Sequence, residues 1–202
     1  LYRSLDGGES SRQSAAAEPL GKSRKVVYQL AALFSLDAFG GGFVVQSMLA
    51  YWLFRRFHLS VGAAGTLFLV TGMFAAASGF VAAWLAARIG LVRTMVFTHL
   101  PANCLLIAAA FMPSMWPAVV MLILRSLLSS MDVPARTSYV MAVVSPAERA
   151  AAASVTNVPR SLAAALPPIA AGAMLDRSTF GWPLVIAGSA KIVYDLLLLR
   201  QF

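Results

Sequence analysis

Charged residues are scarce in this sequence, and acidic residues are the scarcest. Only 12% of the 202 residues are charged, with 8 Asp and Glu against 16 Lys and Arg, whereas soluble domains usually carry about 25%. Apolar residues make up 59%, which is more than one soluble core of this length could bury. Runs of about twenty apolar residues, the length that crosses a bilayer as a helix, recur along the chain. The composition therefore excludes an ordinary soluble domain and predicts a membrane protein.

Residues and motifs of catalytic and metal sites are scarce as well. The single cysteine, Cys104, cannot form an internal disulfide, and its apolar surroundings predict a small core residue. The only other histidine besides His99 is His58, which favours a hydrogen-bonded packing role for His99 over metal binding. No HExxH or Gly-x-Ser-x-Gly motif occurs. We therefore expect no enzyme, no cofactor and no metal site.

The net charge of +8 does not indicate nucleic-acid binding. Most Lys and Arg stand at the ends of apolar runs, as is typical of side chains that face lipid headgroups, and no basic patch is interleaved with aromatic residues. Seven basic residues fall on one side of the predicted membrane: Lys22, Arg24, Lys25, Arg88, Arg93, Arg149 and Arg200. Three fall on the other: Arg55, Arg56 and Arg177. This asymmetry predicts a multi-pass protein of the plasma or inner membrane, with the N-terminal segment and the chain end in the cytoplasm.

Six apolar stretches are long enough to cross a membrane. They cover about 26–54, 61–87, 94–112, 116–144, 150–175 and 183 to the chain end, and their short connections make neighbouring spans antiparallel. Residues 1–25 are polar and rich in Ser, Gly and Ala, which predicts a flexible loop or linker. The chain begins with Leu1 and stops just after an apolar run. We therefore expect residues 26–202 to be an all-α membrane domain cut from a longer protein.

The fourth stretch carries an unusual set of polar residues. At about 100° per residue, five side chains fall within about 80° of one helix face: Arg125, Ser129, Asp132, Arg136 and Tyr139. Charges at that depth are costly, so the stripe indicates a substrate or proton pathway. Pro134 removes a backbone hydrogen bond and either opens the stripe or bends the helix. Asp132 and Arg136 are four residues apart, so a simple neutralising pair is the alternative.

Four further ionisable residues lie inside apolar stretches, namely Asp37, Arg160, Lys191 and Asp195. Asp37 is a candidate for proton coupling, because burial favours the protonated carboxyl; a structural partner of Arg125 or Arg160 is the alternative. Arg125 has no partner in its own helix, so Asp37 or a ligand anion could fill that role. Lys191 and Asp195 have the spacing of an internal pair.

Three segments carry a family resemblance. Residues 83–93 resemble the signature loop of the major facilitator superfamily, with Arg88, Gly90 and Arg93 matching, while Ala83 replaces a Gly and Ala87 replaces the Asp. Residues 122–125 resemble the Arg-containing helix motif of that family. Residues 145–149, Ser-Pro-Ala-Glu-Arg, resemble its loop into the next helix and also have the pattern of a capping box. The resemblance covers about residues 20–202.

The resemblance implies the C-terminal six-helix half of a twelve-helix transporter, built as two inverted three-helix repeats. Residues 1–25 would then be the central cytoplasmic loop, residues 88–93 a gating loop, and the first helix of each repeat a wall of the cavity. The implied activity is secondary transport of a small solute by alternating access, with proton-coupled efflux and uptake both open. The implied partners are the solute, protons, the lipid bilayer and the missing N-terminal half. A non-transporting scaffold or receptor on the same fold is the alternative.

Overall fold

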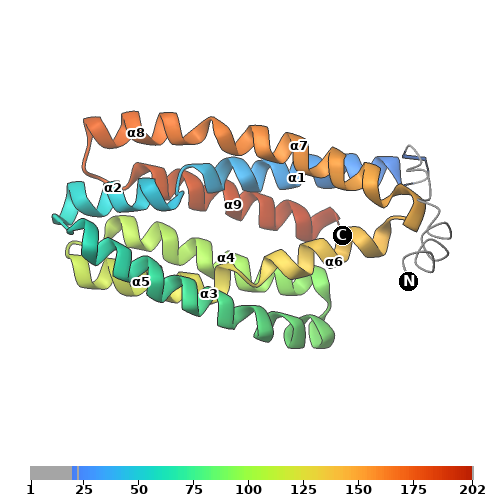
Figure 1. Cartoon of the computed structure of the whole chain (residues 1–202), viewed down its shortest axis with the longest axis horizontal. Coiled ribbons are helices and arrows are strands. Elements are labelled where there is room, and N and C mark those ends of the chain that lie inside the picture. Colours follow the sequence, from blue (N-terminus) through green and yellow to red (C-terminus); the bar gives the residue numbers. More distant parts are fainter. Residues whose placement is uncertain (1–19, 22, 202) are drawn as a thin grey trace, which may run out of the picture.

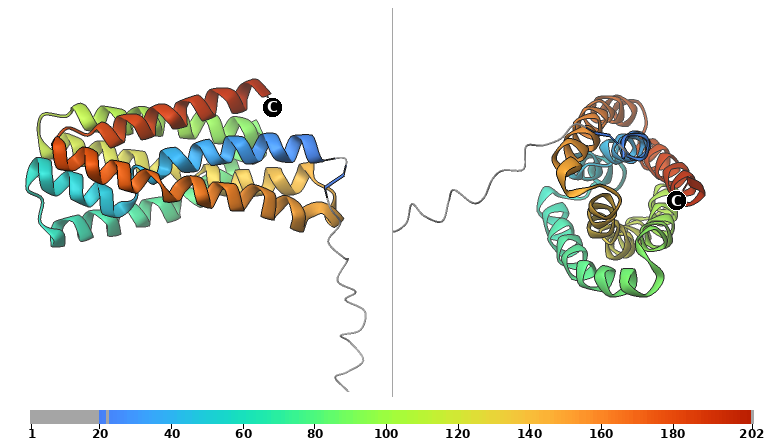
Figure 2. Two further views of the ribbon diagram at one scale, coloured as in Figure 1. Left: turned by 90° about the horizontal axis from the view of Figure 1, so that it is seen from above. Right: turned by 90° about the vertical axis from the view of Figure 1, so that its right-hand side faces the viewer.

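The described part of the chain folds entirely into helices that run roughly along one common axis (Figures 1 and 2). The computed structural model describes residues 20–21 and 23–201, without the side chains of residues 132–134. Its helices are α1 (Arg24–Gly42), α2 (Gln46–Phe57), α3 (Val61–Ile89), α4 (Leu91–Phe111), α5 (Met115–Ser129), α6 (Asp132–Val143), the short 3-10 helix η1 (Pro146–Glu148), α7 (Arg149–Ala165), α8 (Pro167–Arg177) and α9 (Trp182–Gln201).

These helices form the predicted membrane spans. Five segments among the described residues are long and apolar enough to cross a membrane: α1 with α2, α3, α4, η1 with α7 and α8, and α9. The remaining span combines α5, which is apolar but shorter, with α6. The prediction of an all-α membrane domain is therefore confirmed, and several spans consist of two helices in series.

The breaks inside the spans follow from proline and glycine. Pro134 has no N–H to bond the carbonyl four residues earlier, at Ser130, and the helix is interrupted between Ser129 and Asp132. Pro167 likewise follows the break between α7 and α8. The first span is interrupted after Gly42, where Phe43 and Val44 donate backbone hydrogen bonds to Gly40 and Gly41 in a turn. The single continuous helix expected over residues 116–144 is therefore wrong.

Two of these glycines also allow close helix packing. A Cβ on Gly42 would lie 2.7 Å from the carbonyl oxygen of Ala164, and one on Gly40 would lie 3.1 Å from that of Ala187. The first contact is too short for any residue with a Cβ, and the second is tight, so a side chain there would push its neighbour away. The glycine triplet therefore both ends α1 and brings it against α7 and α9.

Apolar side chains form two buried clusters at different depths. One joins α2, α5 and α8 around Trp52, Leu106 and Leu184, and the other joins α1, α6 and α7 around Leu30, Met95 and Tyr194. Both clusters include residues of α4 and α9, so these two helices run through both. The polar residues in the middle of α1, α4 and α9 therefore lie between two apolar layers.

Burial is uneven among the spans. Only 17% of the apolar windows of α3 and of η1–α8 are buried, against 44–56% for the spans of α1–α2, α4 and α9. Both of these poorly buried spans carry large exposed apolar side chains, including Leu69, Phe80, Trp84, Leu162 and Ile169. Cys104 is also exposed, on α4, so its prediction as a core residue is wrong. These outer surfaces are suited to lipid or to another apolar protein surface.

The helix caps follow the sequence in one place and depart from it in another. Ser60 caps α3 as its side chain accepts a hydrogen bond from Ala63 N–H at 3.2 Å. The predicted capping box at 145–148 does not form, because Pro146–Glu148 is a 3-10 turn and α7 begins only at Arg149. The Ser145 hydroxyl donates to the Glu148 carboxylate at 3.2 Å, and that carboxylate accepts from Gly21 N–H.

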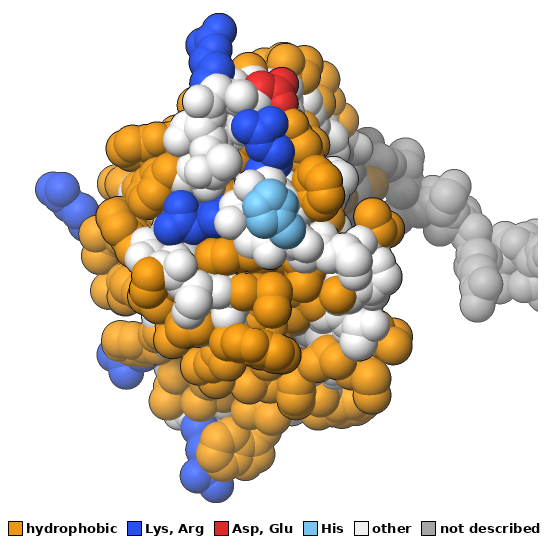
Figure 3. Space-filling model, turned by 90° about the vertical axis from the view of Figure 1, so that its left-hand side faces the viewer, with side chains coloured by type: hydrophobic (Ala, Val, Ile, Leu, Met, Phe, Trp, Pro, Cys, Tyr) orange, Lys and Arg blue, Asp and Glu red, His pale blue; other side chains and the backbone are white. Residues whose placement is uncertain are grey.

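Basic, acidic and histidine side chains gather among apolar ones on the end of the bundle shown in Figure 3. At this end the Tyr51 hydroxyl donates to Asp176 at 2.5 Å and Arg55 donates to the Asp176 carbonyl at 3.3 Å, which ties α2 to α8. Arg56 donates to the carbonyl of Met112 at 3.1 Å. This end of the bundle is therefore held together by polar contacts.

Candidate functional site

Asp37 lies in the middle of α1 and is only 5% exposed. Its carboxylate accepts hydrogen bonds from Lys191 Nζ of α9 at 2.6 Å and from Arg136 Nη1 of α6 at 3.0 Å. His99 Nε2 of α4 lies 3.8 Å away. A buried charge in an apolar bundle is tolerated when it is paired and hydrogen-bonded. Asp37 therefore joins four helices that come from distant parts of the sequence.

The same ring of His99 also faces a second carboxylate. His99 Nδ1 lies 2.9 Å from Asp195 Oδ1, and Asn103 donates to Asp195 Oδ2 at 3.1 Å. Asp195 is completely buried, and His99 is 2% exposed. We use the name Asp37 cluster for the six residues so connected: Asp37, His99, Asn103, Arg136, Lys191 and Asp195.

This arrangement changes the predicted pairings. Lys191 and Asp195 do not pair with each other, because Lys191 reaches across to Asp37 while Asp195 binds His99. The basic side chains that form ion pairs with Asp37 are Arg136 and Lys191. The expected partners, Arg125 and Arg160, form no described ion pair with it. The packing role predicted for His99 is confirmed by its hydrogen bond.

The polar stripe of the fourth span is divided by the break between α5 and α6. Arg125 and Ser129 of α5 line a cavity of about 190 Å³ together with Gln46 and Thr71, while Arg136 of α6 reaches the Asp37 cluster. Tyr139 packs against the apolar cluster around Leu30, Met95 and Tyr194. The side chain of Asp132 lies outside the described residues, so its pairing with Arg136 stays a prediction. The residues of the predicted stripe therefore lie in two separate regions, the cavity beside α5 and the Asp37 cluster.

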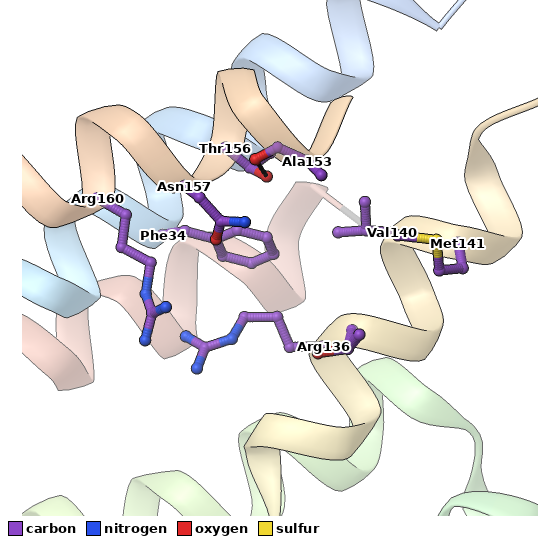
Figure 4. A pocket seen from close by; sticks show the side chains of 9 residues that line it. Phe34, Arg136, Val140, Met141, Ala153, Thr156, Asn157 and Arg160 are labelled. Carbon is purple, nitrogen blue, oxygen red and sulfur yellow. Dashed lines mark hydrogen bonds between the residues drawn. The ribbon is translucent and has the colours of Figure 1, made fainter. Parts of the chain in front are cut away.

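A cavity of about 130 Å³ opens between α6 and α7, and we call it the Arg160 cavity. Its lining includes Phe34, Arg136, Thr137, Asn157 and Arg160. Figure 4 shows the guanidinium groups of Arg136 and Arg160 pointing toward each other from opposite helices. Arg136 also lies over the ring of Phe34, 5.4 Å from its centroid. The cavity therefore carries two cationic groups against one aromatic wall.

Arg160 also lines a neighbouring cavity of about 350 Å³. There it is accompanied by Ser161 and by two members of the Asp37 cluster, Asp37 and Lys191. Gly41 contributes backbone to the same wall. Arg160 is thus the residue shared by both openings, and together they connect α1, α6, α7 and α9.

The basic turn connects α3 to α4. Gly90 adopts φ +88° between α3 and α4, a backbone conformation that favours glycine, and a Cβ there would meet nothing within 4 Å. Arg88 is exposed, with its guanidinium 4.2 Å from the ring centroid of Trp84, and Arg93 is exposed as well. The glycine match in this loop therefore has a clear conformational reason.

Sequence reasoning missed the pairing of His99 with Asp195. The third span has no formal charge, so its composition did not indicate that it takes part in charge pairing. His99 and Asn103 are four residues apart and share one helix face, which was the available signal. Across residues 20–21 and 23–201, no group of three His, Cys, Asp or Glu could hold a metal ion.

Two comparisons with known proteins found a match. The model of the Major Facilitator Superfamily matches residues 30–201. "Uncharacterized membrane protein YJR124C" of Saccharomyces cerevisiae is 25% identical over 178 residues, which are 88% of this chain and 40% of the yeast protein. The chain therefore spans less than half the length of this relative. No solved structure matches the chain.

Proposed function

Because this chain belongs to the Major Facilitator Superfamily, we propose that it is the C-terminal six-helix half of a secondary transporter. Members of this family are generally transporters rather than enzymes. The proposed activity is the movement of a small solute by alternating access, in a plasma or inner membrane. The observation that carries the proposal is the Asp37 cluster, in which buried charges of four helices meet beside two open cavities.

The breaks in the spans support two inverted three-helix repeats. In transporters built from such repeats, discontinuous helices in corresponding positions form the central site. Here the first and fourth spans are both broken, after Gly42 and between Ser129 and Asp132. Each broken span carries polar groups that face a cavity, Asp37 from one and Arg125 and Arg136 from the other.

The unburied surfaces of α3 and α7–α8 support a missing partner. An apolar surface of this extent needs lipid or a second protein surface to cover it. We propose that the N-terminal half packs against these two spans and completes the cavity. Residues 1–25 would be the loop that joins the halves.

The distribution of basic residues supports an orientation with the N-terminal segment and the chain end in the cytoplasm. We propose that the turn between α3 and α4 also faces the cytoplasm and acts as the gating loop through Arg88, Gly90 and Arg93. The end of the bundle that holds Arg55, Arg56 and Arg177 faces the opposite side. The exposed positions of Arg88 and Arg93 are consistent with this role.

Proton coupling is assigned to Asp37 within this proposal. Its carboxylate is the shared partner of Lys191 and Arg136, so adding a proton would release both cations. Such a release would change how α6 and α9 are held against α1. Coupling can therefore act through helix contacts, and efflux by exchange for protons is the direction we propose.

The test is proton flux through the complete transporter that contains this chain. The protein is placed in liposomes with a trapped pH-sensitive dye, and sugars, amino acids, carboxylates and organic cations are added in turn. Flux with one solute class in wild type, and its loss in Asp37→Asn with a normal size-exclusion profile, supports the proposal. Absence of flux, combined with absence of labelled-solute exchange for every class, contradicts it and favours a scaffold or receptor. A misfolded Asp37→Asn protein assigns Asp37 a structural role.

A further inference from the structure

Arg160 is a cation without a described counter-ion. Its Nε is buried and has no hydrogen-bond partner, and the guanidinium forms no ion pair with any carboxylate whose side chain the structure describes. A buried polar group without a partner is costly, and a charged one more so. Arg160 as a whole is half-buried and lines two cavities, so a partner can reach its guanidinium from them.

The surroundings of Arg160 have an excess of positive charge. The described charged side chains that line its two cavities are Arg136, Arg160 and Lys191 against the single carboxylate of Asp37. That carboxylate already accepts from Lys191 and Arg136, and the second carboxylate of the cluster, Asp195, is occupied by His99 and Asn103. If His99 is neutral, these three cations outnumber the two carboxylates by one, and Arg160 is the cation that forms no described ion pair.

The geometry of the Arg160 cavity fits an anion between two arginines. The guanidinium groups of Arg136 and Arg160 point toward each other (Figure 4), and an anion between them would be attracted by both charges. Asn157 lies one helical turn before Arg160 and lines the same cavity, as does Thr137. The side-chain amide of Asn157 supplies a neutral hydrogen-bond donor beside the cationic groups. Planar guanidinium groups bind carboxylate and phosphate oxygens in pairs.

The size of the cavity limits the ligand. Sites for drug-sized molecules are usually about 300–1,000 Å³, and the Arg160 cavity is about 130 Å³. It therefore has room for a carboxylate or phosphate group, while the rest of a solute would extend into the neighbouring cavity. The ring of Phe34 offers an apolar surface beside the charged group.

We propose that the Arg160 cavity binds the carboxylate or phosphate group of the transported solute, with Arg160 as the anchoring cation. This inference rests on the proposed transport function and gives it a substrate class, the small organic or phosphate-bearing anions. The competing arrangement is an ion pair between Arg160 and a carboxylate of the N-terminal half.

The test is ligand-induced thermal stabilisation of the complete transporter in detergent and Tris-chloride buffer. The anionic probes are succinate, lactate, citrate and inorganic phosphate; succinamide and putrescine are the neutral and cationic four-carbon controls. Because a ligand that binds only the folded state raises the midpoint of unfolding, we expect at least one anion to raise Tm by about 2 °C or more. Succinamide and putrescine should leave Tm unchanged.

Variants place the effect at Arg160. Arg160→Gln should abolish the anion-dependent shift, and Arg160→Lys, which keeps the charge but loses the planar fork, should retain part of it. Arg149→Gln on the same helix is the matched control, because Arg149 is exposed and donates to the carbonyl of Met141; its shift should equal that of wild type. Size-exclusion profiles of all variants report folding, and Arg160→Lys carries the test if Arg160→Gln does not fold.

Several results would overturn the inference. They are the absence of a shift with all four anions, an equal shift with succinamide or putrescine, and a full shift retained in Arg160→Gln, which would favour the ion pair with the other half. The liposome assay with the pH-sensitive dye distinguishes failure of the anion-site proposal from failure of the proposed transport function. Flux with a neutral or cationic solute together with no anion binding leaves the transporter intact and removes only the anion site.

Discussion

Arg136 and Arg160 face one cavity from opposite helices, yet their surroundings differ. Arg136 donates to Asp37 and lies over Phe34, whereas Arg160 has a buried Nε with no partner among the described residues. Arg125 of α5 resembles Arg160 in this respect. The charges inside the bundle thus fall into a paired group on α1, α4, α6 and α9 and an unpaired group, Arg125 and Arg160 on α5 and α7, that forms no described ion pair. An ion pair is explained by the fold, while a half-buried charge without one is open to an external partner.

The largest loss of stability should come from removing the carboxylate of Asp37, which is the central residue of the paired group. Asp37→Ala removes the carboxylate that Lys191 and Arg136 share, and breaking a buried pair in this way costs about 3–5 kcal/mol. We expect a large fall in Tm and in the yield of folded protein by size exclusion. Asp37→Asn keeps an acceptor oxygen and should lose less. Equal Tm values for Asp37→Ala and wild type would show that the pairing does not hold the helices.

A smaller effect is expected at the second carboxylate of the same group. Asp195→Ala removes the partner of both His99 and Asn103, and an unsatisfied buried polar group costs about 1–3 kcal/mol. A double-mutant cycle with His99→Ala measures the shared part through Tm. We expect the double variant to lose less than the sum of the two single variants. Strict additivity would argue against a direct interaction.

The apolar spans could be predicted from the sequence, but the paired charges could not. The stretches predicted at 61–87 and 94–112 nearly coincide with α3 and α4, since the apolar length needed to cross a bilayer is fixed. Pro134 indicated that the fourth span is disturbed. The break lies before the proline, because the carbonyl that loses its hydrogen bond is four residues earlier. Helical periodicity by itself predicted one continuous helix with all five polar side chains on a single face.

The pairing errors have a different cause. Lys191 and Asp195 stand four residues apart, which is the spacing of a pair on one helix, yet each finds a partner on another helix. Whether these residues pair with each other or with another helix depends on how α1 and α4 pack against α9. The spacing of residues within one helix does not contain that information. Of the predicted site residues, Asp37 and Arg136 are brought together, and Arg125 is placed in a separate cavity.

The unpaired group should behave in the opposite way from Asp37. Arg125→Gln removes a charge that forms no described ion pair and interacts with Asp37 only through space, so we expect the free energy of unfolding to change by less than about 1 kcal/mol in either direction. Transport in the dye assay should nevertheless be lost. Arg136→Gln is the matched comparison and should lower Tm, because it removes a hydrogen bond to Asp37. Unchanged uptake in Arg125→Gln would refute a functional role for this arginine.

The smallest stability effect is expected for a charge that is neither buried nor ion-paired. Arg88 is exposed and lies 4.2 Å from the Trp84 ring centroid, a contact of about 0.5–1 kcal/mol at an exposed site. Arg88→Gln should therefore lower stability by no more than that amount, as measured by Tm of the complete transporter. Its solute flux should fall much further if the turn acts as a gate, because a gate limits rate without contributing to the folded core. Flux equal to that of wild type would leave Arg88 as a charge that faces headgroups, and would restrict the functional charges of this chain to the buried ones.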